Sequence, residues 1–224
     1  MTYGVIFDMD GVLIDSYHPH FESWRMVAAE TGLAMTEQEF ATTFGRTSRE
    51  IIAHFWGEGF KSDAEIAAID GRKEALYRQL IHANFPAMAG VRELLTGLHA
   101  AGFALAVGSS GPPENVQVVM EALGCPQFFS ATVTGMDVQR GKPDPQVFLL
   151  AAQRLALPPN RCAVVEDAIA GVRAARAAGM AAIAITGTAA REQLAPLADR
   201  VIDSLTELTP AEIAALIDAN GPPR

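Results

Sequence analysis

Carboxylates, a serine and a lysine recur in this sequence at or just beyond the end of short apolar runs, in "VIFDMDG", "FALAVGSS", "RGKPDP" and "CAVVED". The residues are Asp8, Asp10, Ser109, Lys142, Glu166 and Asp167. Carboxylates crowded together raise the cost of ionising one another unless a cation lies among them. Mg²⁺ prefers oxygen ligands, and a fixed lysine can hold a phosphoryl group. The set therefore predicts a magnesium site that binds phosphoryl groups.

Each of these residues also has a structural interpretation. An Asp after a strand can cap a turn through its side chain. Ser109, which Ser110 follows, can be a helix N-cap. An isolated lysine is usually solvated, although Gly141 and Pro143 flank Lys142 where a loop enters a helix. The repetition of the pattern at several loops favours a functional site over these alternatives.

The elements that must position these residues alternate between strands and helices. Apolar runs rich in β-branched or small residues cover 3–7, 103–108, 131–134, 162–165 and 181–185. Helical stripes separate most of them, such as Val91, Leu94, Leu95 and Leu98. This alternation predicts an α/β fold, a Rossmann-like parallel sheet with helices on both faces. Open sheets of this kind bind ligands at the carboxyl ends of their strands, where the reactive residues fall.

One part of the chain breaks this alternation. Between residues 16 and 85 the sequence has helical patterns over 18–30, 37–44, 48–56 and 63–83, with no convincing strand between them. We therefore expect an inserted helical-bundle domain at 16–85, and a catalytic core formed by 1–15 and 86–224.

Composition restricts the class of protein and its partners. Half of the 224 residues are apolar and 19% are charged, as in globular proteins. The net charge of −9 has the wrong sign for a nucleic-acid-binding surface. No apolar stretch approaches the length of about 18 residues that a membrane span needs, and no basic leader precedes the first strand. Cys125 and Cys162 form no paired motif, so we expect a cytoplasmic protein. From the charge and hydropathy we expect no nucleic-acid or membrane partner, and no obligate protein partner is evident.

The motifs "DMDGVLIDS", "VGSS", "GKPDP" and "VVEDAIAGVRAARAAGM" together resemble those of the haloacid dehalogenase superfamily of phosphotransferases. The resemblance covers nearly the whole chain. It is to the branch with a helical cap after the first motif, which includes β-phosphoglucomutases and many small-metabolite phosphatases. It implies that Asp8 is the nucleophile that forms an aspartyl-phosphate, and that Asp10 is the general acid and base.

The same resemblance assigns the remaining core residues. Ser109 and Lys142 would bind the phosphoryl oxygens, and Lys142 would also neutralise Asp8. Mg²⁺ would bridge Asp8 and the phosphate. The Asp10 backbone carbonyl and Asp167 would hold it further, with Glu166 either as a ligand or in support.

In the insert, the resemblance implies a cap that closes, excludes bulk water and selects the leaving group. The candidate substrate-binding residues are His20, Trp24, Gly45, Arg46, Arg49 and Lys73 of the insert, with Ser110 of the core. His20 and Trp24 are four residues apart and share a helix face, where Trp24 can equally belong to the core with His20 as its satisfied neighbour. The resemblance instead implies that both face the cleft and that His20 orients Asp10. Lys73, on an apolar face, either reaches solvent or points into a polar cleft. Arg49 can equally pair with a surface Glu.

Two further interpretations remain open. Mutases that resemble this chain carry polar residues after the second motif to hold a second phosphate, whereas this chain has Gly111, Pro112 and Pro113. Hydrolysis of a small phosphorylated metabolite, expected to be a sugar phosphate, is therefore favoured over β-phosphoglucomutase activity. A signalling receiver also combines acidic residues, a hydroxyl and a lysine, but it lacks a helical insert and carries its acceptor Asp after a middle strand.

Overall fold

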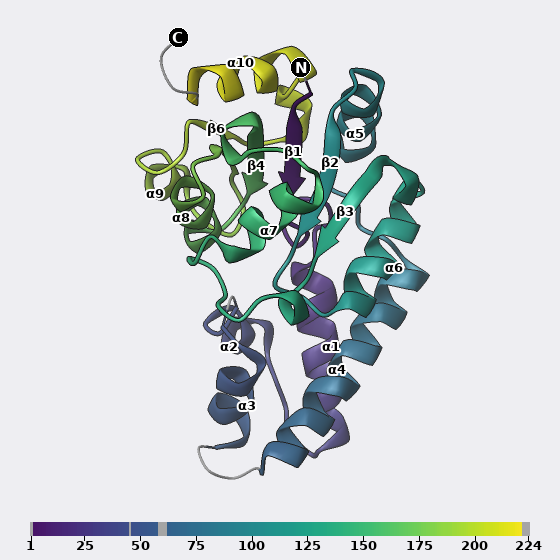
Figure 1. The fold of residues 1–224 in the computed structure, drawn as a ribbon. Helices are drawn as coiled ribbons and strands as arrows, with labels where there is room; N and C mark the ends of the chain where they lie inside the picture. Colours follow the sequence, from purple (N-terminus) through teal and green to yellow (C-terminus); the bar gives the residue numbers. More distant parts are fainter. Residues whose placement is uncertain (1, 45, 58–61, 221–224) are drawn as a thin grey trace. The chain divides into compact units, whose positions relative to one another are not determined.

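A computed structural model describes residues 2–44, 46–57 and 62–220 of the chain (Figure 1). The chain divides into two compact units, Met1–Asp15 with Pro86–Arg224, and Ser16–Phe85. The α/β unit contains β1 (Gly4–Phe7), α5 (Val91–Ala100), β2 (Ala104–Gly108), α6 (Pro113–Leu123), η1 (Pro126–Phe128), β3 (Phe129–Val133), η2 (Gly135–Asp137), α7 (Gln146–Arg154), η3 (Pro159–Arg161), β4 (Cys162–Glu166), α8 (Ile169–Ala177), β5 (Ala181–Ile185), α9 (Arg191–Leu194), β6 (Arg200–Ile202), η4 (Leu205–Glu207) and α10 (Pro210–Asn220). The helical unit contains α1 (Tyr17–Glu30), α2 (Glu37–Ala41), α3 (Ser48–Trp56) and α4 (Asp63–Ala83).

The α/β unit is built on a six-stranded sheet in the order β3-β2-β1-β4-β5-β6. Every neighbouring pair is parallel. Strands β1, β4 and β5 are buried along their whole length, which explains their continuous apolar sequences. The predicted α/β fold with a helical insert is confirmed. The short edge strand β6 was not among the predicted strands.

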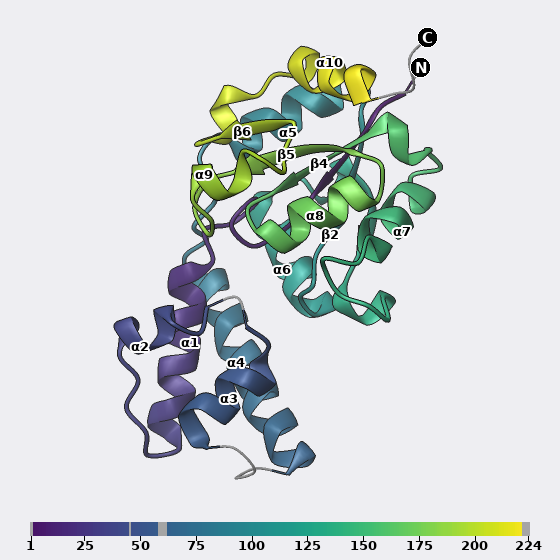
Figure 2. The ribbon, with the colours of Figure 1, turned by 90° about the vertical axis from the view of Figure 1, so that its left-hand side faces the viewer.

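Helices cover both faces of this sheet. Helices α7 and α8 pack on one face, and α5 and α10 pack on the other (Figure 2). The core between the sheet and α7 and α8 includes Ile6, Val164, Phe148 and Val172, each no more than 2% exposed. The chain passes from β1 to β2 and β3 on one side, and then returns to β4, β5 and β6 on the other. The order of the strands therefore reverses between β1 and β4, where sheets of this kind bind ligands.

Local capping marks the N-termini of three helices in the helical unit. Helices α2, α3 and α4 each begin with a capping box, in which a Ser or Thr hydroxyl accepts from the third backbone N–H while a Glu carboxylate accepts from the cap residue. The three caps are Thr36, Thr47 and Ser62. The helix predicted over 37–44 ends earlier, at Ala41. No helix among the described residues combines the length and apolarity that crossing a membrane requires.

Candidate active site

Three carboxylates meet at the carboxyl ends of the two central strands. Asp8 follows β1 directly, Glu166 is the last residue of β4, and Asp167 comes next. Phe7 is paired with Val165, and the Asp8 N–H continues the ladder by donating to the Val165 carbonyl at 3.0 Å. The strand register thus brings Asp8 beside Glu166 and Asp167. One ligand atom from each of these residues lies within 4.8 Å of the others.

Lys142 joins this group from the loop before α7. Its Nζ lies 2.8 Å from Asp8 Oδ1 and 2.7 Å from Glu166 Oε1. It also lies 5.0 Å from the centroid of the Phe148 ring. Burial disfavours the charged ammonium, but Asp8 and Glu166 outweigh that effect and raise the pKa of Lys142. The lysine is therefore a permanently charged cation beside Asp8.

The positive charge of Lys142 does not balance the negative charges of Asp8, Glu166 and Asp167 when all three are ionised. Asp8 is 9% exposed, Asp167 5% and Glu166 1%. Burial is the largest influence on Asp8 and, with Glu166 and Asp10, raises the pKa of Asp8 to about 7 against the pull of Lys142. Burial, Glu166 and Asp8 likewise raise the pKa of Asp167 well above its ordinary value. Three ionised carboxylates with one ammonium would carry two uncompensated negative charges, which a divalent cation would neutralise.

Glu166 is fixed at both oxygens by groups of the chain. Oε1 accepts from Lys142, and Oε2 accepts from the Ala168 N–H at 2.7 Å. These contacts orient Glu166 toward the lysine. Asp167 receives a hydrogen bond from the Thr188 side chain, in the loop after β5. Sequence reasoning did not identify Thr188, because nothing in "TGTAA" marks which residue reaches the site.

Gly11 and Gly171 have no Cβ atom, and this leaves room for the carboxylates of Asp167 and Glu166. A Cβ atom on Gly11 would lie 2.0 Å from Asp167 Oδ2, and one on Gly171 would lie 1.6 Å from Glu166 Oε1. Gly11 also has a φ of +71°, which L side chains rarely adopt. Gly171 lies inside the motif "VVEDAIAGV", but its role was missed because its contact is tertiary.

Ser109 lies at the same sheet edge, after β2. It is 1% exposed, and its backbone N–H donates to the Val133 carbonyl at 3.0 Å. Its Oγ accepts from the Gly111 N–H at 3.0 Å, so the hydroxyl keeps its proton for donation to another group. Ser110, in contrast, is exposed.

Asp10 lies in the tight loop after β1, which the Gly11 N–H closes by donating to the Ile14 carbonyl at 2.9 Å. It is half-buried. Its carboxylate is not one of those that converge within 4.8 Å of one another in the described part of the chain. Asp10 as a metal ligand through its backbone carbonyl, and as the acid and base, stays a prediction.

In the helical unit, the predicted residues fall into two groups. His20, Trp24 and Lys73 come together: Lys73 Nζ is 2.8 Å from His20 Nδ1 and 5.7 Å from the Trp24 ring centroid. Trp24 is 2% exposed within the core of this unit, as the structural interpretation expected.

Of the second group the structure describes Arg46 and Arg49, and these two have different surroundings. Arg46 is exposed, and Arg49 forms an exposed ion pair of 2.7 Å with Asp63, a surface Asp rather than the Glu considered above. Gly45 lies outside the described residues. A role for these three residues in substrate binding stays a prediction.

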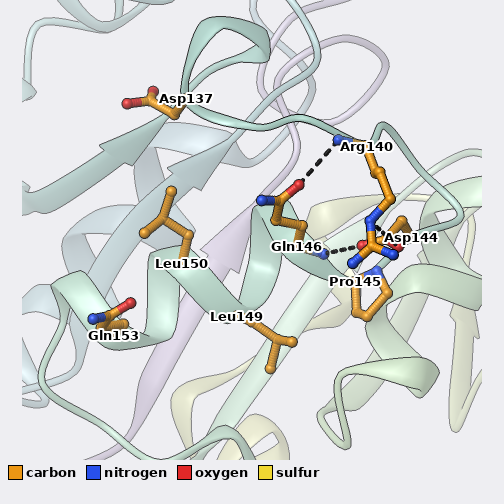
Figure 3. Close-up of a pocket in the computed structure, with 8 residues that line it drawn as sticks. All are labelled: Asp137, Arg140, Asp144, Pro145, Gln146, Leu149, Leu150 and Gln153. Atoms are coloured by element: carbon orange, nitrogen blue, oxygen red, sulfur yellow. Dashed lines mark hydrogen bonds and ion pairs between the residues drawn. The ribbon is translucent and has the colours of Figure 1, made fainter.

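A separate hollow of about 400 Å³ lies beside α7 (Figure 3). It is lined by Asp137, Arg140, Asp144, Pro145, Gln146, Leu149, Leu150 and Gln153. Arg140 pairs with Asp144 at 3.0 Å, and the side-chain amide oxygen of Gln146 accepts a hydrogen bond from the Arg140 backbone N–H. None of the predicted site residues lines this hollow, so it is distinct from the carboxylate cluster.

Comparisons with known proteins found similar sequences and structures over most of the chain. The family model of haloacid dehalogenase-like hydrolases matches residues 4–179. Hexitol phosphatase A of Escherichia coli is 36% identical over 208 residues, covering 92% of this chain and 93% of that protein. Beta-phosphoglucomutase of Bacillus subtilis is 33% identical over 187 residues, covering 81% of this chain and 82% of that protein. The crystal structure of a HAD hydrolase, family IA, variant 3, from Entamoeba histolytica aligns with a TM-score of 0.86 at 27% identity, over 97% of this chain and all of that one.

Proposed function

We propose that this chain, which belongs to the haloacid dehalogenase-like hydrolase family, is a magnesium-dependent phosphatase. Its substrate would be a small phosphorylated metabolite, namely a sugar phosphate. The observation that carries the proposal is the buried group of Asp8, Glu166 and Asp167 with the Lys142 ammonium among them. A nucleophilic carboxylate beside a fixed cation suits attack on a phosphoryl group, whose negative oxygens need cationic partners.

The reaction would proceed in two displacements. An Asp8 oxygen attacks phosphorus while the bond from phosphorus to the ester oxygen breaks, and Asp10 donates a proton to that leaving oxygen. A water then attacks the phosphorus of the aspartyl-phosphate, Asp10 accepts the water proton, and the bond to Asp8 breaks. Asp8 returns as a carboxylate, and the products are inorganic phosphate and the alcohol. Ser109 donates its hydroxyl proton to a phosphoryl oxygen, and Lys142 compensates the negative charge there.

The acidic residues fit a hard divalent cation. Asp8 and Asp167, with the Asp10 carbonyl, would hold Mg²⁺, while Glu166 keeps Lys142 in place. When bound, the ion supplies charge stabilisation for the phosphoryl group. Burial first, and then the neighbouring carboxylates, raise the pKa values of Asp8 and Asp167, and a bound cation would favour the ionised form of both groups.

The relatives support the substrate class but divide over the reaction. The name of hexitol phosphatase A denotes the hydrolysis of a phosphate ester, whereas that of beta-phosphoglucomutase denotes an isomerisation. Both proteins resemble this chain over most of its length. Gly111, Pro112 and Pro113 lack the polar side chains that a second phosphate would need, so hydrolysis is the first choice and phosphomutase activity the alternative. A receiver module is the weaker alternative.

The helical unit would serve as the cap that selects the leaving group. The enzyme would be cytoplasmic, without a nucleic-acid, membrane or obligate protein partner.

A screen of phosphorylated sugars, polyols, glycolate and nucleotides tests the proposal. We expect inorganic phosphate to be released from sugar or polyol phosphates with Mg²⁺, and release to cease with excess chelator. Asp8→Asn is the matched inactive variant. β-Glucose 1-phosphate with and without a bisphosphate activator separates the alternatives, because activator-dependent isomerisation with little free phosphate would assign the chain to the mutases. Turnover by Asp8→Asn at the wild-type rate would remove Asp8 from the mechanism.

A further inference from the structure

The loop that carries Lys142 runs from η2 to α7, and its residues 138–145 form neither strand nor helix. Lys142 Nζ nevertheless lies between two carboxylates, 2.8 Å from Asp8 Oδ1 and 2.7 Å from Glu166 Oε1. A lysine side chain is a flexible four-carbon stem, so its ion pairs alone do not determine where the backbone of the loop lies. Other groups of the chain must hold that backbone in place.

The side chain of Gln146, the first residue of α7, closes this loop. Its Oε1 accepts from the Gln139 N–H at 2.9 Å and from the Arg140 N–H at 3.0 Å (Figure 3). Of the two atoms at the end of an amide side chain only the oxygen accepts, so the converging N–H groups also establish the orientation of the amide. One side chain therefore joins the start of the loop to its end, across seven positions of the sequence.

Asp144 supports the same closure. Its Oδ1 accepts from the Gln146 N–H at 3.0 Å, and its Oδ2 lies 3.0 Å from Arg140 Nε. The Asp144 N–H donates to the Gly141 carbonyl at 3.0 Å, which makes a turn of the residues around Lys142. The Arg140 side chain is 74% exposed, so its ion pair contributes little by itself. The two backbone bonds to Gln146 Oε1 are therefore the main closure of the loop.

Helix α7 is a rigid support for these bonds. Val147 is 2% exposed, and Phe148 and Ala151 are fully buried in the core between this helix and the sheet. The centroid of the Phe148 ring lies 5.0 Å from the Lys142 ammonium, a distance at which an aromatic face attracts a cation. The same helix thus contacts the lysine segment twice, at the backbone of its loop through Gln146 and at its ammonium through Phe148.

We propose that Gln146 is a positioning residue for Lys142, because the closed loop places the lysine ammonium between Asp8 and Glu166 before any substrate binds. A loop without this closure has more conformations, and the ammonium must then be ordered at each binding event. The effect of Gln146 on turnover rests on the proposed function, in which Lys142 binds phosphoryl oxygens. Its effect on the placement of the lysine does not.

NMR of the lysine ammonium groups tests the placement without any substrate. The chain has three lysines, Lys61, Lys73 and Lys142, so the ¹⁵Nζ spectrum of the full-length protein is simple and Lys142→Arg identifies the Lys142 signal. The Lys142 side chain is 9% exposed and ion-paired, and protons of such an ammonium exchange slowly with water. We expect a Lys142 signal at pH 7 and low temperature in the wild type, and its loss through exchange broadening in Gln146→Leu. A wild-type signal in Gln146→Leu, or no Lys142 signal in the wild type, overturns the proposal.

Gln146→Glu is the conservative variant that should restore the placement. A carboxylate oxygen accepts from the same two N–H groups, and an acidic residue is favourable in the first turn of a helix. We therefore expect the wild-type Lys142 signal in this variant. Gln146→Asn keeps the amide but is one carbon shorter, so it should lose the signal and provides the same test if Gln146→Leu does not fold. Amide hydrogen exchange at Gln139 and Arg140 measures whether the two bonds remain.

Kinetics test the contribution of this placement to catalysis. Lys142 would bind phosphoryl oxygens that are present in the bound substrate and in the transition state alike, so misplacing it should raise KM more than it lowers kcat. We expect Gln146→Leu to raise KM for a sugar phosphate, and Ki for inorganic phosphate, about fivefold, with kcat changed less than about twofold. Gln146→Glu should keep wild-type values. Wild-type KM and Ki in Gln146→Leu would contradict the positioning role.

Gln153→Leu is the matched control. Gln153 lies two turns further along α7, is exposed, and lines the same hollow, but Figure 3 shows its amide away from the bonds that close the loop. We expect wild-type kinetics and the wild-type Lys142 signal, and thermal unfolding establishes that each variant is folded. If Gln153→Leu raises KM as much as Gln146→Leu, the added apolar side chain is the cause and the positioning role is wrong. If the wild type hydrolyses no phosphate ester, the proposed function fails, whereas the ammonium spectra still decide the placement of Lys142.

Discussion

Gly171 is the residue whose substitution should test the placement of the Glu166 carboxylate most directly. A Cβ atom here would lie 1.6 Å from Glu166 Oε1 and 1.9 Å from its carboxyl carbon. Glu166 is 1% exposed and tied to Lys142 and the Ala168 N–H, so it cannot move without losing those bonds. We expect Gly171→Ala to reduce kcat/KM at least about tenfold and to destabilise the fold by about 1–3 kcal/mol. Phosphate-release kinetics and urea unfolding check this expectation.

The control for that substitution is Gly97→Ala, in α5 of the same unit. A Cβ atom on Gly97 meets nothing closer than a Pro210 carbon at 3.7 Å. This variant should keep wild-type activity and gain up to about 1 kcal/mol, because alanine is the better helix former. Equal activity in both glycine variants would mean that the placement of Glu166 does not matter to turnover.

At the level of single residues, the sequence predicted that carboxylates meet at one sheet edge, but it did not predict the contacts between individual side chains. The spacing of Asp8 from Asp10 and the acidic pair Glu166 and Asp167 pointed to the sheet edge where three of these carboxylates meet. The partners of Lys73 could not be predicted, because His20 lies on another helix and reaches it only through the packing of α1 against α4. Gly171 and Thr188 were missed for the same reason.

At the level of elements, one carboxylate ties the end of β3 to α7. Asp137 Oδ1 lies 2.6 Å from Arg154 Nη2, and its Oδ2 accepts from the Thr134 N–H at 2.8 Å. Arg154 also donates to the Thr132 carbonyl. The bonds from Arg154 and Thr134 lower the pKa of Asp137 to about 2. The folded state therefore favours the ionised carboxylate more than the unfolded chain does.

This lowered pKa gives a testable dependence of stability on pH. Because the folded pKa lies below the unfolded one, the stabilisation is complete above about pH 5 and is lost as the pH falls through about 4 to about 2. We expect Asp137→Asn to cost about 1 kcal/mol at pH 7, after allowance for solvent screening. The difference from wild type should shrink toward pH 3. Urea unfolding at both pH values measures it.

Asp63→Asn serves as the comparison, because the Asp63 side chain is 88% exposed in its pair with Arg49. That substitution should change stability by less than about 0.5 kcal/mol at either pH. A loss in Asp137→Asn that persists unchanged at pH 3 would show that ionisation of Asp137 is not the source of the stabilisation.

The elements differ in how clearly the sequence predicted them. Helices α3 and α4 match the predicted ranges, since each has a capping box and an apolar stripe. β6 was missed because Arg200–Ile202 is short, lies at the edge of the sheet, and is held mainly by pairing with β5. A three-residue run offers too few positions to show a period of two.

For the whole molecule, the order of the strands matters more than any single element. β1 and β4 are distant in sequence and adjacent in the sheet, and this adjacency creates the carboxylate cluster. The alternation of strands and helices predicted a parallel sheet, but it does not determine which strands are neighbours in that sheet. The interruption by helical patterns over 16–85 did predict the inserted unit, because the change of period from strand to helix is visible locally.

Magnesium should stabilise the whole α/β unit. An ion that binds the folded state but not the unfolded chain adds about 1.4 kcal/mol at ten times its Kd. We expect a rise of a few degrees in Tm with saturating Mg²⁺, and no such rise for Asp167→Asn. Differential scanning calorimetry with Mg²⁺ and with the same concentration of Na₂SO₄ separates specific binding from a general salt effect. An equal rise in Asp167→Asn would place the bound ion elsewhere.

The proposed reaction depends on transfer of the phosphoryl group to the Asp8 carboxylate. The direct measurement is rapid acid quenching of the enzyme during turnover of a sugar phosphate with Mg²⁺, followed by peptide mapping by mass spectrometry. We expect the peptide containing Asp8 to gain the mass of one phosphoryl group, and hydroxylamine to remove this group as it does from an acyl phosphate. Turnover with the added mass on any other residue would contradict it.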